Sequence, residues 1–157
     1  MTLTTYVNYA GKCAEAFKFY EQHLGGKITM LMVNFGPLET VPERFRQRRL
    51  YQHNAAVTLM RTSADECDAI GLRIAGQLNR ATGPTVLVLP LRGVSAIDAE
   101  SQPFYDPQAD RVLFTSLRSH LDPRIRIVEV DAHINDSRFA EVVSTEMLDL
   151  LRARQRT

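Results

Sequence analysis

Hydrophobic and polar positions follow a regular rhythm from about residue 56 to the end of the chain. Short apolar runs at residues 56–60, 85–89 and 125–130 predict strands, and the continuous run at 85–89 is typical of a strand covered on both faces. Between and after these runs, apolar residues recur at helical spacing, which predicts three helices. Strands that alternate with helices predict an α/β domain with a mainly parallel sheet and helices on both faces, a Rossmann-like three-layer arrangement.

Each predicted helix carries a local signal at its start. Ser63 and Glu66 form a capping-box pattern before the first helix, and Asp106-Pro107 places proline at the first position of the second. The pair Asp136-Ser137 offers a cap for the last helix. The helices are expected to present apolar stripes made of Ile70, Ile74 and Leu78, then of Val112, Leu113, Leu117 and Leu121, then of Phe139, Val142, Val143, Met147, Leu150 and Leu151.

The part of the chain before residue 56 is less regular. Residues 4–9 alternate weakly like a strand, residues 13–24 show helical spacing that ends at Gly25-Gly26, and residues 27–33 predict another strand. Residues 34–54 contain two prolines and four arginines. This segment is expected to be mostly loop with a short helical turn.

Composition places the chain among soluble, single-domain proteins. It has 157 residues, of which 45% are hydrophobic and 24% charged, enough to bury a core. The formal net charge of +1 excludes a whole-molecule attraction to nucleic acid or to an acidic membrane. Cys13 and Cys67 lie in predicted helices without C-x-x-C spacing, which is typical of reduced thiols. With no leader pattern and no apolar run of ~20 residues, we expect the protein in the cytoplasm, without a membrane partner.

Polar residues that could carry chemistry follow three of the predicted strands. In open parallel sheets, ligands bind beyond the carboxyl ends of the strands, where connecting loops and helix N-termini converge. We therefore expect three consecutive strand ends to line one edge of the sheet. Their polar residues are Arg61, Thr62 and Ser63 after the first strand, Arg92, Gly93, Ser95 and Asp98 after the second, and Asp131, His133, Asn135 and Asp136 after the third.

The loop at residues 91–103 is the strongest candidate for a ligand contact. It is long for a connection from strand to helix, whose usual length is ~2 to 6 residues. Gly93 lets backbone N–H groups approach an anion, while Arg92 and Ser95 supply a charge and a hydroxyl, which suits a phosphate or carboxylate. The segment matches neither the P-loop nor the dinucleotide-binding glycine pattern, so a purely structural turn is the alternative.

Other chemistries remain open for this loop, for the residues after the third strand and for an arginine cluster earlier in the chain. Ser95, Asp98 and His133 stand in the chain order of an α/β-hydrolase triad, although the closing glycine of a nucleophile elbow is missing. Asp98, Asp106, Asp131 and Asp136 could hold Mg²⁺ together with a nucleotide, and Asp98 is the candidate ligand among them. The alternative is that Asp106 and Asp136 are helix caps. The arginines of residues 43–49, with Phe45 and Tyr51 among them, could meet RNA or nucleotide phosphates, or could form a solvated face.

Several runs resemble a known family. The residues that carry the resemblance are Val33-Asn34-Phe35-Gly36-Pro37, residues 58–62, Arg92-Gly93-Val94-Ser95-Ala96-Ile97-Asp98, Gln102-Pro103-Phe104-Tyr105-Asp106-Pro107 and Asp131-Ala132-His133-Ile134-Asn135-Asp136. Residues 32–151 are similar to the last part of the Tm-1-like ATP-binding domain, named for the tomato mosaic virus resistance protein. Glu100 and Ser101 depart from the family, which more often shows Pro-Gly or Gly-Gly there.

This resemblance implies a nucleotide site. ATP, accompanied by Mg²⁺, would be the ligand, with the phosphates at Arg92, Gly93 and Ser95. The full set of binding residues that it suggests is Arg61, Arg92, Gly93, Val94, Ser95, His133, Asn135 and Asp136. The chain carries only the last part of the second of two α/β halves, so we expect a truncated domain.

The opening of the chain resembles a different family. Residues 8–20, followed by Leu24-Gly25-Gly26, are similar to the start of PhnB-like proteins of the glyoxalase and bleomycin-resistance superfamily. Tyr6 and Asn8 stand where metal-dependent relatives place a first ligand, which argues against that superfamily's lyase or dioxygenase chemistry. Residues 1–31 would then form a PhnB-like fragment packed with residues 32–157 into one globular unit.

Three functions from different classes follow from these observations. The leading hypothesis is a nucleotide-binding domain without turnover. Its enzyme rival is a hydrolase that uses Ser95 and His133. The third hypothesis is a structural remnant that forms a homo-oligomer, because a shortened parallel sheet leaves an open edge and uncovered apolar surface.

Overall fold

The computed structural model describes residues 36–154. The predicted strands at residues 4–9 and 27–33, and the predicted helix at 13–24, lie outside this range. The described part begins with two short 3-10 turns, Leu38–Thr40 and Glu43–Phe45, and a third, Ala96–Asp98, follows later. The regular elements are β1 Leu50–Asn54, β2 Val57–Met60, α2 Ala64–Leu78, β3 Val86–Pro90, α3 Pro107–His120, β4 Arg126–Val130 and α4 Ser137–Arg154.

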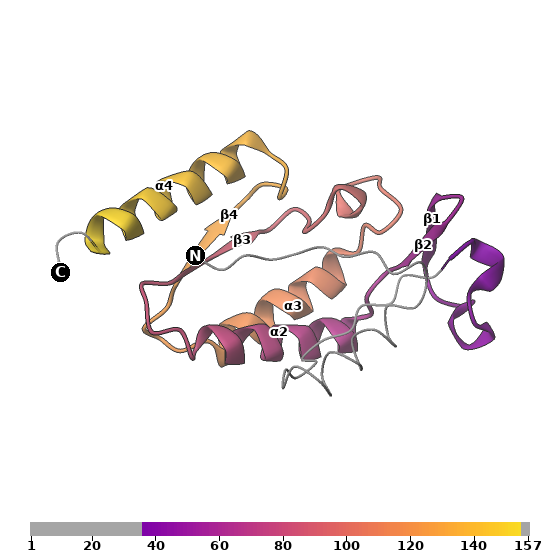
Figure 1. Ribbon diagram of the computed structural model, residues 1–157, viewed down its shortest axis with the longest axis horizontal. Helices are drawn as coiled ribbons and strands as arrows, with labels where there is room; N and C mark the ends of the chain where they lie inside the picture. Colours follow the sequence, from indigo (N-terminus) through magenta and orange to yellow (C-terminus); the bar gives the residue numbers. More distant parts are fainter. Residues whose placement is uncertain (1–35, 155–157) are drawn as a thin grey trace, which may run out of the picture.

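Helices cover both faces of the central strand pair. Figure 1 shows β3 and β4 side by side, with α2 and α3 on one face and α4 on the other. The two strands are parallel, and Val86 pairs with Arg126 at one end while Pro90 pairs with Val130 at the other. The predicted α/β class with a layered arrangement is therefore confirmed.

Two apolar clusters hold the layers together, one on each face of β3 and β4. On the first face, Leu87 and Leu89 of β3 pack with residues of α2 and α3 such as Ala75 and Phe114. On the opposite face, Val88 packs with Val130 of β4 and with Phe139 of α4. Successive residues of β3 thus enter opposite cores, which explains the continuous apolar run of this strand.

The helix starts form as the sequence predicts. Ser63 caps α2 in a complete capping box with Glu66, and the Asp106 side chain accepts the backbone N–H of Ala109 at the start of α3. The predicted apolar stripes are correct in part: in α4, Phe139 and Val142 pack against the core, whereas Met147 and Leu151 are 55% and 50% exposed. Ile74 and Leu78 pack against the core, whereas Ile70 is 40% exposed.

Two predictions about the strands are wrong. Residues 50–54 form β1, within the segment expected to be mostly loop, because they pair antiparallel with β2 and Leu50 lies opposite Met60. This hairpin is a sheet of its own, separate from β3 and β4. The residues after β2 therefore do not share a sheet edge with those after β3 and β4, and only two strand ends line that edge.

Candidate functional site

The loops after β3 and β4 run side by side at the carboxyl end of the parallel pair. The N–H of Leu91 donates to Val130 O (2.9 Å), and the N–H of Arg92 donates to Ala132 O (3.1 Å). The N–H of Ile134 returns to Gly93 O at 3.1 Å. These hydrogen bonds extend the pairing beyond the strands, so both loops form a firm edge where the sequence predicts a ligand site.

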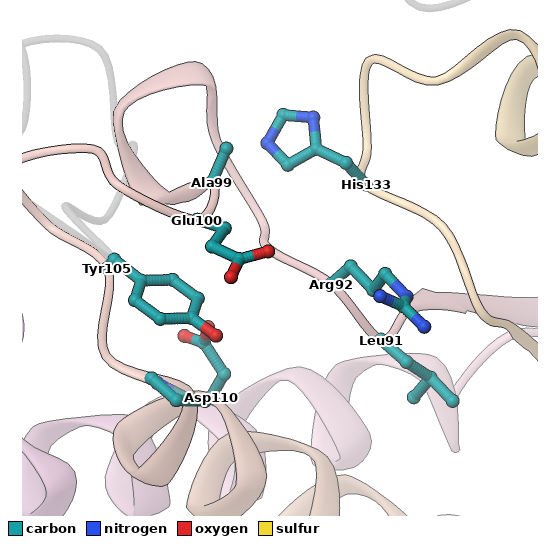
Figure 2. Close-up of a pocket in the computed structure, with 8 residues that line it drawn as sticks. Leu91, Arg92, Ala99, Glu100, Tyr105, Asp110 and His133 are labelled. Atoms are coloured by element: carbon teal, nitrogen blue, oxygen red, sulfur yellow. The ribbon is translucent and has the colours of Figure 1, made fainter.

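A pocket of about 300 Å³ opens beside this edge (Figure 2). This volume is at the lower end of the range for small-molecule sites. The loop after β3, the segment at residues 99–105, the first turn of α3 and the loop after β4 all contribute to it. Its lining residues are Leu91, Arg92, Ala99, Glu100, Tyr105, Pro107, Asp110 and His133.

Arg92 is held in place by Asp131 across the two loops. Its Nε and Nη2 atoms lie 2.6 and 2.9 Å from the two carboxylate oxygens of Asp131, a bidentate pair. The guanidinium holds the pKa of the Asp131 carboxyl below its usual range. An arginine has five N–H donors, and Asp131 takes two of them. Arg92 is exposed, so the remaining donors can meet a ligand.

Gly93 occupies a position that requires glycine. Its φ of +126° lies outside the region open to other residues, and an added Cβ would stand 2.7 Å from the carbonyl oxygen of Asp98. The same Cβ would lie 2.9 Å from Cδ2 of His133. Gly93 therefore lets the loop after β3 pass close to the turn at Asp98 and to the loop after β4 that carries His133.

The geometry of His133 does not form the predicted hydrolase triad. Its Nε2 lies 2.7 Å from the backbone carbonyl oxygen of Ser95, and its Nδ1 lies 3.1 Å from the backbone N of Asn135. Nε2 therefore donates and Nδ1 accepts, and both ring nitrogens are engaged away from the Ser95 hydroxyl. The imidazole thus links the loops after β3 and β4 and lines the pocket. Ser95, Asp98 and His133 have the chain order of a hydrolase triad, but their side chains are not arranged as one.

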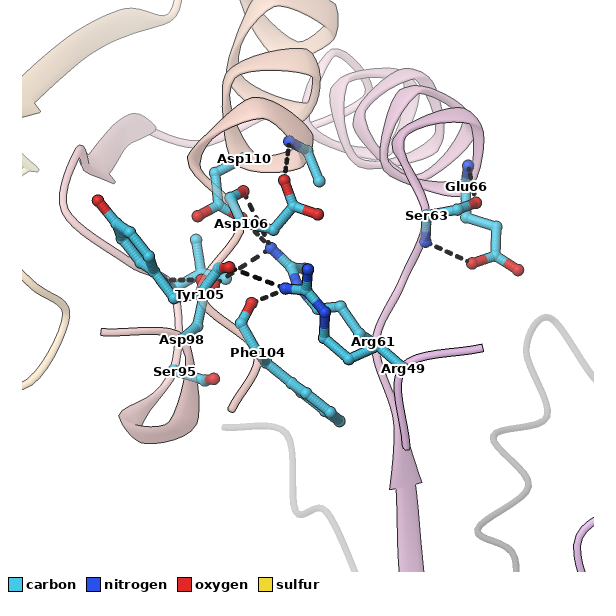
Figure 3. Close-up of polar contacts among 12 residues, drawn as sticks. Arg49, Arg61, Ser63, Glu66, Ser95, Asp98, Phe104, Tyr105, Asp106 and Asp110 are labelled. Atoms are coloured by element: carbon cyan, nitrogen blue, oxygen red, sulfur yellow. Dashed lines mark hydrogen bonds and ion pairs between the residues drawn. The ribbon is translucent and has the colours of Figure 1, made fainter. Parts of the chain in front are cut away.

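Arg61 and Asp98 belong to a buried network under the pocket (Figure 3). Arg61 Nη2 lies 2.6 Å from Asp110 Oδ1 and 3.2 Å from Asp98 Oδ1, while Nε donates to Phe104 O at 2.9 Å. The second oxygen of Asp98 accepts the N–H of Val94 at 3.0 Å. Arg61 is 8% exposed and Asp98 is 1% exposed, so both hold the loop and helix in place rather than lining the pocket.

Asp110 links this network to the pocket. It is 5% exposed, yet it is one of the pocket's lining residues. Burial raises the pKa of the Asp110 carboxyl from 3.8 to about 6; the nearby Asp98 also raises it, and the hydrogen bond from Arg61 acts against both. Two carboxylates thus share one guanidinium beneath the pocket.

Of the eight nucleotide-binding residues that the sequence suggests, Arg92 and His133 line the pocket. Gly93, Val94 and Ser95 shape its edge through the backbone. Asp136 Oδ1 accepts the N–H of Arg138 at 2.9 Å, which is the contact of a helix cap for α4. Glu100, Tyr105 and Asp110 also line the pocket, although no sequence pattern predicted them as site residues. A signal for Glu100 was its place in the long loop at residues 91–103, for Tyr105 its position just after that loop, and for Asp110 its position in the first turn of α3.

The arginines of residues 43–49 have partners within the protein. Arg46 pairs with Glu43 at 2.9 Å, and Arg48 pairs with Glu66 at 2.6 Å. Arg49 donates to the backbone oxygen of Tyr105 at 2.8 Å. The guanidinium carbon of the fourth, Arg44, lies 4.7 Å from the ring centre of Phe45. These contacts favour a structural role for the cluster over an RNA-binding one.

Two further expectations concern metal ions and membranes. Among residues 36–154, no group of three or more His, Cys, Asp or Glu side chains is placed to hold a metal ion. Asp98, the candidate magnesium ligand, faces Arg61 instead. No helix in this part of the chain has the length and apolar character needed to cross a bilayer.

Comparison with known proteins agrees with the resemblance of residues 32–151. Residues 28–151 match the uncharacterised protein family UPF0261, C-terminal domain. A UPF0261 protein of Clostridium tetani is 48% identical over 121 residues, which are 76% of this chain and 30% of the relative. One from Rhizobium meliloti is 45% identical over 130 residues, covering 82% of this chain and 33% of the relative.

A plant relative is also similar. The ToMV resistance protein Tm-1(GCR237) of Solanum lycopersicum is 40% identical over 121 residues, which are 76% of this chain and 16% of that protein. The chain thus spans a third or less of the length of these relatives. The resemblance of residues 1–31 to PhnB-like proteins is not supported by these comparisons, and those residues lie outside the described range. The family match over residues 28–151 shows that the chain belongs to the UPF0261 family, in its C-terminal domain.

Proposed function

We propose that this chain is a nucleotide-binding α/β domain that holds ATP, with Mg²⁺, without turning it over. The observation that carries the proposal is the pocket at the carboxyl ends of β3 and β4, with the exposed guanidinium of Arg92 on its wall. Open parallel sheets bind ligands at this edge. The resemblance to Tm-1-like ATP-binding domains supports the choice of nucleotide.

Arg92 is the residue proposed to meet the phosphates. Asp131 already fixes its side chain, so binding loses little additional side-chain freedom. The N–H donors that Asp131 leaves open can bind a phosphate oxygen. The positive φ of Gly93 lets the backbone next to Arg92 pass close to Asp98 and His133.

The proposal for binding without turnover rests on the same geometry. The imidazole of His133 is tied to the carbonyl of Ser95 and to the amide of Asn135, so it is not placed to activate a hydroxyl or a water. Asp98, a candidate for the metal or the acid, is engaged by Arg61 and by the N–H of Val94.

Thermal unfolding with Mg-ATP, Mg-ADP and inorganic phosphate tests the proposal. A ligand present at 100 times its dissociation constant adds ~2.7 kcal/mol of stability, which a melting curve resolves. Arg92→Ala should abolish the shift with ATP. Arg124→Ala is the matched control, because Arg124 is also exposed and also paired with an aspartate, Asp122, but precedes the amino end of β4. If Mg-ATP raised the melting temperature of both variants equally, Arg92 would not be part of the binding site.

We also propose that the chain forms a homo-oligomer through α4. Apolar side chains of this helix stand 37–55% exposed, and they are Val143, Met147, Leu148 and Leu151. An apolar stripe of this kind on one helix suits pairing with the same stripe of a second copy. Light scattering should show a dimer for the parent chain and a monomer for Met147→Glu, and a monomeric parent chain would refute the proposal.

A further inference from the structure

We propose that the pocket binds the ribose of a nucleotide through its acidic wall, Glu100 and Asp110, and so selects nucleoside phosphates that carry both ribose hydroxyls. The inference rests on the nucleotide-binding function proposed above, and it adds which part of the ligand lies where. It concerns three lining residues, Glu100, Tyr105 and Asp110, to which the resemblance assigns no role.

The pocket has two walls of opposite character. Figure 2 shows Arg92 and His133 on one side, from the loops after β3 and β4. On the other side stand Glu100, Tyr105 and Asp110, from the segment before α3 and its first turn. A ligand that fills this space therefore meets a guanidinium at one end and carboxylates at the other. A phosphate suits the first wall and is repelled by the second.

The carboxylate of Asp110 is fixed in place. Arg61 holds one of its oxygens at 2.6 Å from below, and the same guanidinium nitrogen lies 3.2 Å from Asp98. Two carboxylates against one guanidinium leave an excess of negative charge in a buried place. A hydrogen-bond donor that enters from the pocket would offset this charge, because a buried carboxylate gains from each donor that reaches it.

Hydroxyl groups fit this wall better than further anions. A sugar hydroxyl donates to a carboxylate oxygen without bringing a charge of its own, and an acidic residue that binds a ribose hydroxyl is a recurrent feature of nucleotide sites in α/β folds. The ring of Tyr105 is 40% exposed and lines the same wall, so it offers a flat apolar surface to the sugar or the base. Inorganic phosphate or polyphosphate would use only the Arg92 wall.

The test is a calorimetric titration of the full chain, near neutral pH, with three magnesium-bound ligands. They are ATP, 2′,3′-dideoxy-ATP, which lacks both ribose hydroxyls, and tripolyphosphate, which lacks the nucleoside. Losing hydrogen bonds to a charged partner should weaken binding of the dideoxy ligand about tenfold or more relative to ATP. Tripolyphosphate should bind more weakly still, because it also loses the contact of the nucleoside with Tyr105.

Two variants connect the preference to the acidic wall. Glu100 is exposed, so Glu100→Ala should leave the fold intact, bring the ATP and dideoxy affinities close together, and leave tripolyphosphate binding unchanged or stronger. Asp110→Asn should reduce the preference in the same direction. Glu141→Ala, at an exposed position of α4, is the matched control and should keep the preference.

The outcomes separate the two proposals. Equal affinity of the parent chain for ATP and dideoxy-ATP would overturn the ribose inference, while the nucleotide site itself would stand. A preference that survives Glu100→Ala and Asp110→Asn unchanged would also overturn it. Absence of binding for all three ligands would refute the proposed function, and the ribose inference with it.

Discussion

Arg61 and Asp110 are 49 residues apart in sequence, and their side chains meet at 2.6 Å in a buried ion pair. Arg61 follows β2, and Asp110 lies in the first turn of α3. This pair joins the β1–β2 hairpin to the layered part of the fold, and the same guanidinium also faces Asp98. The floor of the pocket therefore depends on a contact between the segment that follows the β1–β2 hairpin and the first turn of α3.

Replacing Arg61 should destabilise the protein strongly. In Arg61→Met, Asp98 and Asp110 would remain buried without their shared cation, and removal of one partner from a buried pair typically costs about 3 to 5 kcal/mol. Urea unfolding measures the loss. Arg124→Ala is the control, because its exposed pair with Asp122 should matter little. A loss as small as that of the control would show that the network is not structural.

Stability should depend on pH through Asp110. Its carboxyl has a pKa of about 6 in the folded protein against 3.8 ordinarily, so the folded state binds the proton more tightly. The contribution of Asp110 is thus fully present below pH 3.8 and is lost as the pH rises through about 6. Arg61 and Asp98 are the charged groups that face it.

The pH effect is measured as a difference between two chains. The free energy of unfolding of the parent, minus that of Asp110→Asn, should fall as the pH rises across this interval, because all other titrating groups are common to both. A difference that stays constant, or rises with pH, would contradict the assigned direction of the pKa shift.

Adding a methyl group should have opposite effects at two glycines. Gly93→Ala places a Cβ 2.7 Å from a backbone oxygen at a φ of +126°, and strain of this kind costs of order 1 to 3 kcal/mol. Gly76 lies inside α2, where a Cβ meets nothing within 4 Å, so Gly76→Ala should stabilise by roughly 0.5 to 1 kcal/mol. Thermal melts of both variants check the pair, and stabilisation by Gly93→Ala would refute the close approach at this edge.

Ser101 has an unfavourable backbone conformation that glycine should relieve. Its φ of 68° is in the left-handed region, which glycine adopts without strain and serine does not. We expect Ser101→Gly to raise the free energy of unfolding by up to about 1 kcal/mol, since relief of strain outweighs the extra freedom of the unfolded chain. Ser119→Gly, at an exposed position in α3, should instead lower it. Destabilisation by both would show that Ser101 is not strained.

Local signals in the sequence were sufficient to predict the helices and the central strands. The capping box at Ser63 and the Asp106-Pro107 pair act within a few residues, and the apolar run of β3 reflects its burial on both faces. The fold class followed from their alternation. Such features depend on neighbours along the chain, which a single sequence contains.

Features that depend on distant partners were missed or misassigned. β1 is a polar strand that forms because β2 pairs with it, and its own pattern gives no sign of this. Arg61 follows a strand and has a charge, so it looked like a ligand contact, yet its partners lie 37 and 49 residues further on. His133 lies at the predicted edge. The sequence could not show that both of its ring nitrogens are hydrogen-bonded to the backbone, because one of these partners, Ser95, is distant along the chain.

The most direct test of the central claim, that a nucleotide binds at the carboxyl edge of β3 and β4, is backbone amide mapping by NMR during titration with Mg-ATP. The account predicts that the shifted amides gather at residues 91–95, 99–110 and 131–135, and that Arg92→Ala removes these shifts while Arg124→Ala keeps them. Shifts confined to the opposite edge, around residues 122–126, or no shifts at saturating ligand, would contradict it.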